Sequence, residues 1–314
     1  MLDPYDIHSL IEVSTPSLSP GGDAVAYVQT ETNDEKSATC SRLMIHKDGG
    51  NRPLSSGPKD SSPIFSPDGA QVGFLREREG EEKQVWVVQE SGKTERQVSN
   101  LAGGVQAFAW APESDRLVVV SRVDPEPKVD ENGPHTQVVN RVRYRDDGDG
   151  WRGDAFFQLF VVSVKGGEAE QLTAGEGDHL APVWSPTGDR IAYVSDAVEG
   201  RDLSRHSEVC VIPADGGESA RWSDGMTRAG SVAWSHDGHQ LVAAGSHDSD
   251  VWDPRQSWLY VLEEGHPVRM VAGEDRTIVQ PIAERCWTHN DDLVYIADRA
   301  GESYLCSVHA NGGE

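Results

Sequence analysis

One ten-residue phrase returns along the whole chain and constrains its fold more than any other feature. It reads LSPGGDAVAY at 18–27, FSPDGAQVGF at 65–74, WAPESDRLVV at 110–119, WSPTGDRIAY at 184–193, WSHDGHQLVA at 234–243 and WTHNDDLVYI at 287–296. Successive copies begin 47, 45, 74, 50 and 53 residues apart. Self-similarity at a period of roughly 40 to 50 residues is the signature of a repeat architecture.

The chemistry of the phrase is that of a β-hairpin. In one copy it places Ser66, Pro67, Asp68 and Gly69 between two apolar stretches. Proline pre-sets its φ near about −65°, aspartate bonds to nearby backbone, and glycine accepts the positive φ of a tight turn. Because other copies change the polar residues, with Ala111 in the serine position, we interpret the set as turn chemistry and not as a catalytic pair.

Each copy belongs to a unit with one internal plan. An alternating strand such as RIAYVS (190–195) follows the turn, then a third strand such as EVCVIP (208–213), a Gly-Gly turn and a fourth strand such as EAEQLT (168–173). Four short strands at this period predict the blades of a β-propeller. We therefore expect an all-β chain, with residues 1–314 forming one β-propeller domain whose six visible units start near 18, 65, 110, 184, 234 and 287. The recurring aromatic residues are expected to pack between blades instead of stacking on a ligand: Phe65, Trp110, Trp184, Trp234 and Trp287.

The charge of the chain excludes several classes of partner. It carries 52 acidic against 28 basic residues, a formal net charge of −24. Such a surface repels phosphate backbones and anionic membranes, so we expect neither as a partner. The acidic residues are scattered over the whole length, which is typical either of adaptation to high salt or of an ordinary acidic cytoplasmic protein.

Targeting and cysteine patterns indicate a soluble, cytoplasmic protein. The first twenty residues carry acidic side chains where a secretory signal has basic ones, and the chain has no apolar run of about 18 residues. The four cysteines are far apart and form no CxxC pair, so we expect free thiols and no metal or other cofactor: Cys40, Cys210, Cys286 and Cys306.

The repeats resemble those shared by the prolyl oligopeptidase family and TolB-like proteins. The aromatic-Ser-Pro-Asp-Gly turn, the Asp-Gly-Gly-Glu turn and a Leu-Thr ending carry the resemblance over essentially the whole chain. The segment VNRVRYRDDGDGW (139–151), followed by FQLFVVSVKGGEAEQLT (157–173), is similar to the middle of the propeller in acylaminoacyl-peptidase-type members. The resemblance implies an N-terminal propeller of seven or eight blades that gates an α/β-hydrolase domain and admits short peptides.

The hydrolase half of that family is absent from these 314 residues. Its serine lies on a G-x-S-x-G elbow, whereas the nearest approach here, GESYL at 301–305, lacks the second glycine. We therefore expect no catalytic residue in this chain and no activity from it alone. The chain stops after a glycine turn, so either its N-terminal segment closes the ring or the polypeptide is a fragment. A free-standing TolB-like propeller that acts as a protein-binding scaffold is the alternative, and subunit association stays open.

The third interval between copies of the phrase, 74 residues, is longer than the others and predicts an insertion at 121–156, within or beside the third unit. A long charged excursion from a regular repeat has no packing reason to exist, so it is the best place for function. It holds four candidate contacts to the carboxylate or carbonyl groups of a peptide substrate: Arg141, Arg143, Tyr144 and Arg145. In the alternative interpretation they pair with the acidic residues that follow and dock the loop: Asp146, Asp147 and Asp149.

Three other polar clusters look less like sites. The stretch DDGDG (146–150) lacks the glutamate of a calcium loop. His236 and His239 fall in a repeat turn, where exposed turn histidines are expected instead of a metal pair. Three further aspartates are interpreted as a solvated loop: Asp248, Asp250 and Asp253.

Overall fold

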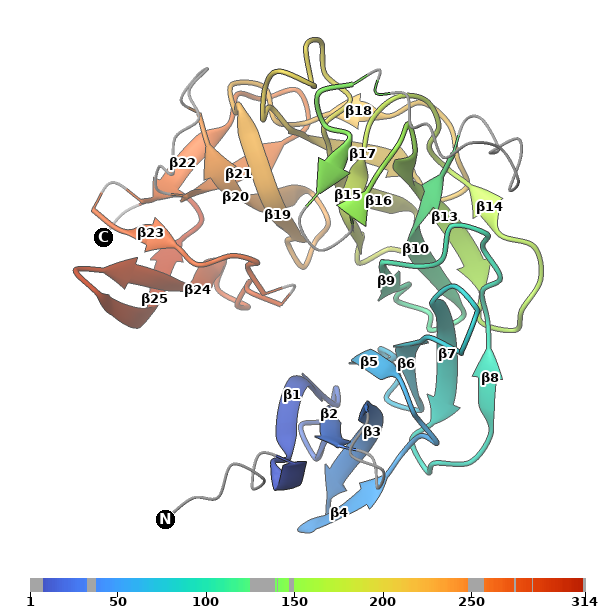
Figure 1. Ribbon diagram of the computed structural model, residues 1–314. Coiled ribbons are helices and arrows are strands. Elements are labelled where there is room, and N and C mark those ends of the chain that lie inside the picture. Colours follow the sequence, from blue (N-terminus) through green and yellow to red (C-terminus); the bar gives the residue numbers. More distant parts are fainter. Residues whose placement is uncertain are drawn as a thin grey trace. The chain divides into compact units, whose positions relative to one another are not determined.

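The computed structural model describes residues 8–32, 38–124, 139, 141–146, 150–247, 257–273, 275–283 and 285–312. Almost all of its regular structure is antiparallel β-strand (Figure 1). The described strands form five four-stranded sheets, one three-stranded sheet and one small hairpin. The all-β prediction and the prediction of four-stranded propeller blades are thereby confirmed. The chain divides into two compact units, one of residues 1–121 with 161–170 and the other of residues 122–160 with 171–314.

Two complete sheets belong to the first unit. The first sheet contains β1 (Glu12–Leu18), β2 (Ala24–Thr32), β3 (Thr39–Lys47) and β4 (Gly50–Pro53). The second contains β5 (Asp60–Phe65), β6 (Gln71–Arg76), β7 (Gln84–Gln89) and β8 (Glu95–Gln97). In both sheets each strand pairs with the next one along the chain, which is the up-and-down order expected of a propeller blade.

The third sheet carries the insertion. It contains β9 (Ala107–Trp110), β10 (Arg116–Val123), β13 (Phe156–Ser163) and β14 (Glu170–Gln171), and the division between the two units runs through it. The long connection between β10 and β13 includes a two-stranded hairpin of β11 (Arg145–Asp146) and β12 (Gly150–Trp151). The insertion therefore leaves the sheet after its second strand and returns at its third.

Three sheets follow in the second unit. The fourth contains β15 (His179–Trp184), β16 (Arg190–Ser195), β17 (Glu208–Pro213) and β18 (Ala220–Arg221). The fifth contains β19 (Arg228–Trp234), β20 (Gln240–Ser246), β21 (Trp258–Glu263) and β22 (Arg269–Ala272). The sixth has three described strands, β23 (Thr277–Ile278), β24 (Asp292–Arg299) and β25 (Glu302–His309).

The recurring phrase forms the hairpin between the first two strands of a sheet. Asp68 accepts hydrogen bonds from the hydroxyl of Ser66 (2.6 Å) and the amide of Ala70 (3.0 Å), while Gly69 adopts a φ of 73°. The Ser66 hydroxyl oxygen in turn accepts from the amide of Gln71 at 3.0 Å. The serine and aspartate of the phrase are thus fully engaged in closing the turn.

The aromatic residues at the ends of the first strands connect successive repeats. The five recurring aromatic residues are 5% to 7% exposed, as expected for packing between sheets: Phe65, Trp110, Trp184, Trp234 and Trp287. Three of the indole N–H groups make the same contact: Trp110 donates to the carbonyl of Ile64 at 3.0 Å, one residue before Phe65. Trp234 donates in the same way to the carbonyl of Val183 (3.2 Å), one residue before Trp184 of the preceding repeat. Trp287 donates to the carbonyl of Ala233 (3.3 Å), one residue before Trp234.

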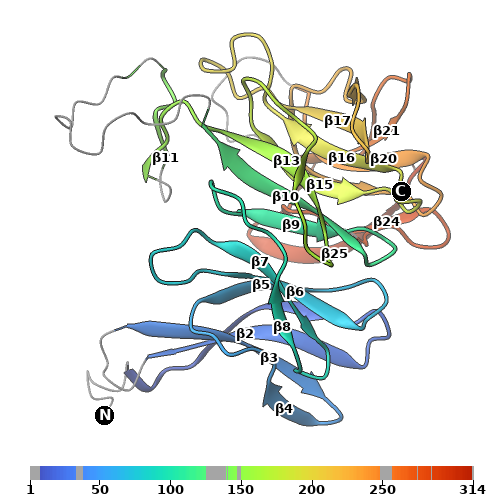
Figure 2. The same ribbon diagram turned by 90° about the vertical axis from the view of Figure 1, so that its right-hand side faces the viewer.

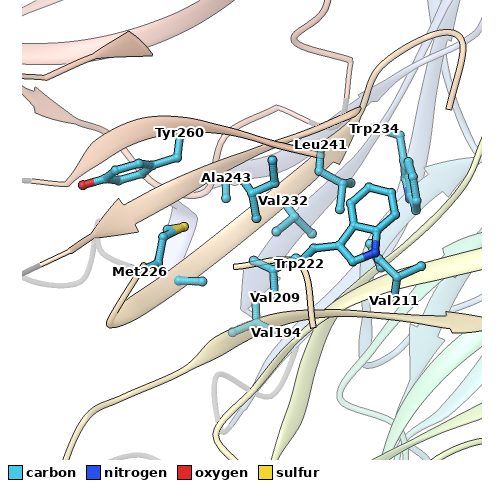
Figure 3. Packing of buried hydrophobic residues seen from close by; sticks show 13 residues of the cluster. Val194, Val209, Val211, Trp222, Met226, Val232, Trp234, Leu241, Ala243 and Tyr260 are labelled. Carbon is cyan, nitrogen blue, oxygen red and sulfur yellow. The ribbon is translucent and has the colours of Figure 1, made fainter. Parts of the chain in front are cut away.

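The apolar core is built between neighbouring sheets. In the second unit a cluster of buried residues packs Val209 and Val211 of β17 against Val232 of β19 (Figure 3). Trp222 and Trp234 meet edge to face in the same cluster, with ring centroids 5.5 Å apart. Burial of apolar surface on both faces of each sheet is the main force that holds such a stack together.

Two sequence predictions about the whole chain can be compared with the structure here. All four cysteines are free thiols, as expected. Within the described residues, no helix is both long and apolar enough to cross a membrane.

Candidate functional site

The site is built around the predicted insertion. Figure 2 shows β11 in the connection that precedes β13. Arg145 pairs with Trp151 across the β11–β12 hairpin, and the amide of Arg152 donates to the carbonyl of Tyr144 at 2.9 Å. These backbone contacts fix the position of Arg145 and of the arginine-rich stretch before it.

Two insertion arginines are paired with the loop that follows β16. Arg141 donates two hydrogen bonds to the carboxylate of Asp202, at 2.8 and 3.3 Å. Arg143 donates to Asp196 at 3.0 Å and also to the carbonyl of Ser204. Bidentate and charge-assisted bonds of this kind are geometrically specific, so these two arginines dock the insertion on that loop.

The paired charges continue as a network. Arg201 lies between Asp196 (3.3 Å) and Asp202 (3.5 Å). Asp196 also accepts from the amide of Asp178 at 2.7 Å, and Asp178 is bound by Arg152. Burial raises the pKa of Asp196, although the backbone hydrogen bond and the nearby arginines favour its charged form.

An aromatic ring adds to this anchoring. Phe156, the first residue of β13, is 4% exposed. The guanidinium groups of Arg141 and Arg201 lie 4.2 and 4.3 Å from its ring centroid. Cation–π contacts are stronger when they are desolvated, so Phe156 further fixes the two arginines in their paired positions.

Beside this network lies a cavity of about 580 Å³. Cavities that bind small ligands span roughly 300 to 1,000 Å³, and this one lies within that range. It is lined by the insertion, by the loop after β16 and by the start of β19. Its charged residues are five arginines and three aspartates: Arg143, Arg145, Arg152, Arg205, Arg228, Asp178, Asp196 and Asp202.

The excess of arginine makes the cavity cationic in a protein whose net charge is −24. Acidic surroundings repel large polyanions, while a local cluster of guanidinium groups attracts a small anion. The guanidinium groups suit binding and orientation of an anionic or carbonyl-rich group.

The four predicted contact residues occupy different positions. Arg143 and Arg145 line the cavity, whereas Arg141 lines a neighbouring hollow of about 720 Å³. Tyr144 is 41% exposed and is not among the described residues that line either space. The expected partners Asp147 and Asp149 lie outside the described residues.

Sequence reasoning missed the other half of the cavity. Its residues Asp196, Asp202 and Ser204 belong to the loop after β16, and Arg228 begins β19. The arginine-rich stretch GRDLSRH at 200–206 was the available signal.

The other polar clusters have structural contacts. His236 hydrogen-bonds through Nε2 to the carbonyl of Trp287 at 2.9 Å and stacks on His289, with ring centroids 5.2 Å apart. In the part of the chain that the structure describes, no group of three or more histidine, cysteine or acidic residues is arranged to hold a metal ion. Three aspartates lie outside that part, so their interpretation as a solvated loop stays a prediction: Asp248, Asp250 and Asp253.

The fold and the cavity define the chain as a β-propeller repeat protein with a cationic cavity. No known family profile matches it. Over 216 residues it is 31% identical to the uncharacterized peptidase YuxL of Bacillus subtilis, a match that covers 66% of this chain and 33% of that protein.

Solved structures are similar to this chain in fold. An acylaminoacyl peptidase of Pyrococcus horikoshii superposes with a TM-score of 0.74 and 20% identity, over 98% of this chain and 47% of that one. A putative TolB from Agrobacterium tumefaciens matches less well, with a TM-score of 0.52, 18% identity and coverage of 84% and 82%. The chain thus matches the propeller part of acylaminoacyl peptidases, and it spans about a third of the curated peptidase and under half of the solved one.

Proposed function

We propose that the chain is the substrate-selecting propeller of an acylaminoacyl-peptidase-like serine peptidase that acts on short peptides, and that it holds no catalytic residue itself. The observation that carries the proposal is the match of nearly the whole chain to the propeller part of an acylaminoacyl peptidase. The sequence match to a curated peptidase supports the same assignment.

The cationic cavity gives this role a physical basis. A peptide presents carbonyl oxygens and a terminal carboxylate, both of which accept hydrogen bonds from guanidinium groups. A cavity of about 580 Å³ has room for only a short segment of chain. Binding in this cavity orients a peptide, while the aspartates that pair with the arginines keep the cavity wall rigid. The cavity also selects ligands by size, because a folded protein cannot enter it.

The proposal is tested with the full product of the gene and with the chain of residues 1–314, assayed side by side on acyl-peptide and aminoacyl chromogenic substrates. We expect the full product to contain a G-x-S-x-G hydrolase domain and to cleave these substrates, and the chain alone to be inactive. Hydrolysis by the chain alone would contradict the proposal. A reading frame that stops at Glu314 would favour the TolB-like scaffold instead.

We also propose a cytoplasmic setting. The four free thiols support it, because cysteines of exported proteins are commonly paired. Thiol titration of the protein purified without reductant should find four reactive groups after denaturation, and a lower count would argue for an oxidising compartment.

A further inference from the structure

Four of the five arginines of the cavity fall into two groups. Arg143 and Arg152 are bound to Asp196 and Asp178, so much of their charge is already neutralised. Arg145 and Arg228 are exposed and line the same cavity. Within the described part of the chain, no ion pair of either residue is found. The excess positive charge of the cavity therefore includes these two side chains, which keep their donors available for a ligand.

A buried hydroxyl in the cavity also lacks a partner. The side-chain oxygen of Ser204 is inaccessible to solvent, yet within the described residues it makes no hydrogen bond. Its own carbonyl binds Arg143, which holds this part of the loop in place. A buried polar atom without a partner is costly. Ser204 lines the cavity, so a rotation of its side chain about χ1 would let the hydroxyl donate to a bound anion.

The wall of the cavity adds an apolar feature. Val142, Leu180 and Leu203 are 65%, 36% and 82% exposed, and all three line the cavity. Large aliphatic side chains that gather in this way around a polar centre indicate a binding surface. An isolated inorganic anion would leave this apolar surface uncovered.

We propose that the cavity binds a peptide carboxylate that lies next to a large apolar side chain, with Arg145, Arg228 and Ser204 as the residues that bind the carboxylate. Val142 and Leu203 contact the apolar side chain. This inference rests on the proposed function, because it takes the ligand to be a peptide. It adds the chemical class of the group that the cavity selects, a carboxylate beside an apolar side chain. The carboxylate has two sources, the end of the peptide chain or an acidic side chain.

Calorimetric titration with three peptides tests this. The probes are Ala-Ala-Leu, Ala-Ala-Leu amide and Ala-Glu-Leu amide. We expect the free acid to bind at least about tenfold more tightly than its amide, since charge-assisted hydrogen bonds are lost in the amide. If Ala-Glu-Leu amide binds as tightly as the free acid, the site accepts a side-chain carboxylate. If it binds as weakly as Ala-Ala-Leu amide, the site selects the chain terminus.

Matched variants locate the binding. The double variant Arg145→Gln/Arg228→Gln should weaken binding of the free acid by about tenfold or more, and Ser204→Ala should weaken it by a smaller factor. The control Lys93→Gln/Arg285→Gln removes the same charge from exposed positions outside the cavity, so it should change the affinity by less than about twofold. Circular dichroism of each variant confirms that its fold is unchanged.

Two results would overturn the inference. One is equal affinity of the wild-type protein for the free acid and its amide. The other is a cavity variant that binds the free acid as tightly as the control variant. Neither result affects hydrolysis by the full gene product, so this inference can fail while the proposed function stands. Conversely, the full gene product could lack peptidase activity while the cavity still binds the peptide carboxylate. The proposed function would then fail, and the inference about the cavity would stand.

Discussion

The ion pair between Asp60 and Arg76 gives the sharpest test of what holds the first unit together. The two residues face each other across β5 and β6, and their side chains are 0% and 5% exposed. Two parallel bonds of 2.6 and 2.9 Å join them. The carboxylate also accepts from the hydroxyl of Ser55 and from the amide of Gly57.

The change Asp60→Asn keeps the shape and removes the charge. Every acceptor position of this carboxylate faces a donor, so the new NH₂ group meets N–H or O–H groups whichever way the amide is turned. Hydrogen bonds to charged groups contribute about 1.5 to 3 kcal/mol each, and breaking one side of a buried pair costs about 3 to 5 kcal/mol. Arg76 keeps its ion pair with Glu95 at 2.6 Å, so we expect the free energy of unfolding of the first unit to fall by about 3 kcal/mol, the lower end of that range.

Urea denaturation followed by circular dichroism measures the loss, and hydrogen exchange of the β5–β8 amides locates it in this sheet. The matched control is Glu77→Gln, which breaks an exposed pair with Lys59 beside the same strands. Exposed pairs contribute at most about 1 kcal/mol. If Asp60→Asn costs no more than Glu77→Gln, the buried pair does not stabilise the sheet as argued.

Three further predictions concern the second unit. Burial lowers the pKa of His179 to about 4, so only the unfolded state takes up its proton as the pH falls below about 6.5. Stability should be full above that pH and fall by about 3 kcal/mol towards pH 4, a loss that urea titrations of His179→Phe should lack. Ala300 has a φ of 53° in the two-residue turn before β25, so Ala300→Asn should add about 0.5 to 1 kcal/mol, and an unchanged or lower Tm would contradict this. A Cβ on Gly245 would lie 2.0 Å from the carbonyl oxygen of Arg228, so Gly245→Ala should cost at least about 1 to 3 kcal/mol in urea denaturation, and a neutral effect would argue against the close approach.

Much of the fold was predictable because its signals are local. The turn built on Ser66, Asp68 and Gly69 is encoded within five residues, and its recurrence predicted units of four short strands. Where the recurring phrase is less regular, the predicted strand positions are less accurate. The first strand of the sixth sheet is at Thr277–Ile278, while Trp287 makes only an isolated bridge with Leu293.

The site was predictable only in part, because its contacts are distant in sequence. The acidic residues that bind Arg141 and Arg143 lie 61 and 53 positions away from them in the sequence. Proximity in sequence pointed to the aspartates next to them instead. Arg228 carries no local signal at all, since it opens an ordinary strand and reaches the cavity only through the packing of one sheet on the next.

The bond from the indole of Trp110, Trp234 or Trp287 to the carbonyl one residue before the aromatic residue of the preceding repeat has a consequence for how such a chain can change in evolution. Both halves of the junction, the donor and the acceptor, lie within one repeat, as Trp234 shows by donating to Val183 while its neighbour Ala233 accepts from Trp287. A duplicated repeat would therefore contain both the indole donor and the carbonyl acceptor, so it could form this hydrogen bond with the repeat on either side. Gene duplication can lengthen or shorten an array of this kind by whole repeats without a second, compensating mutation at the joint.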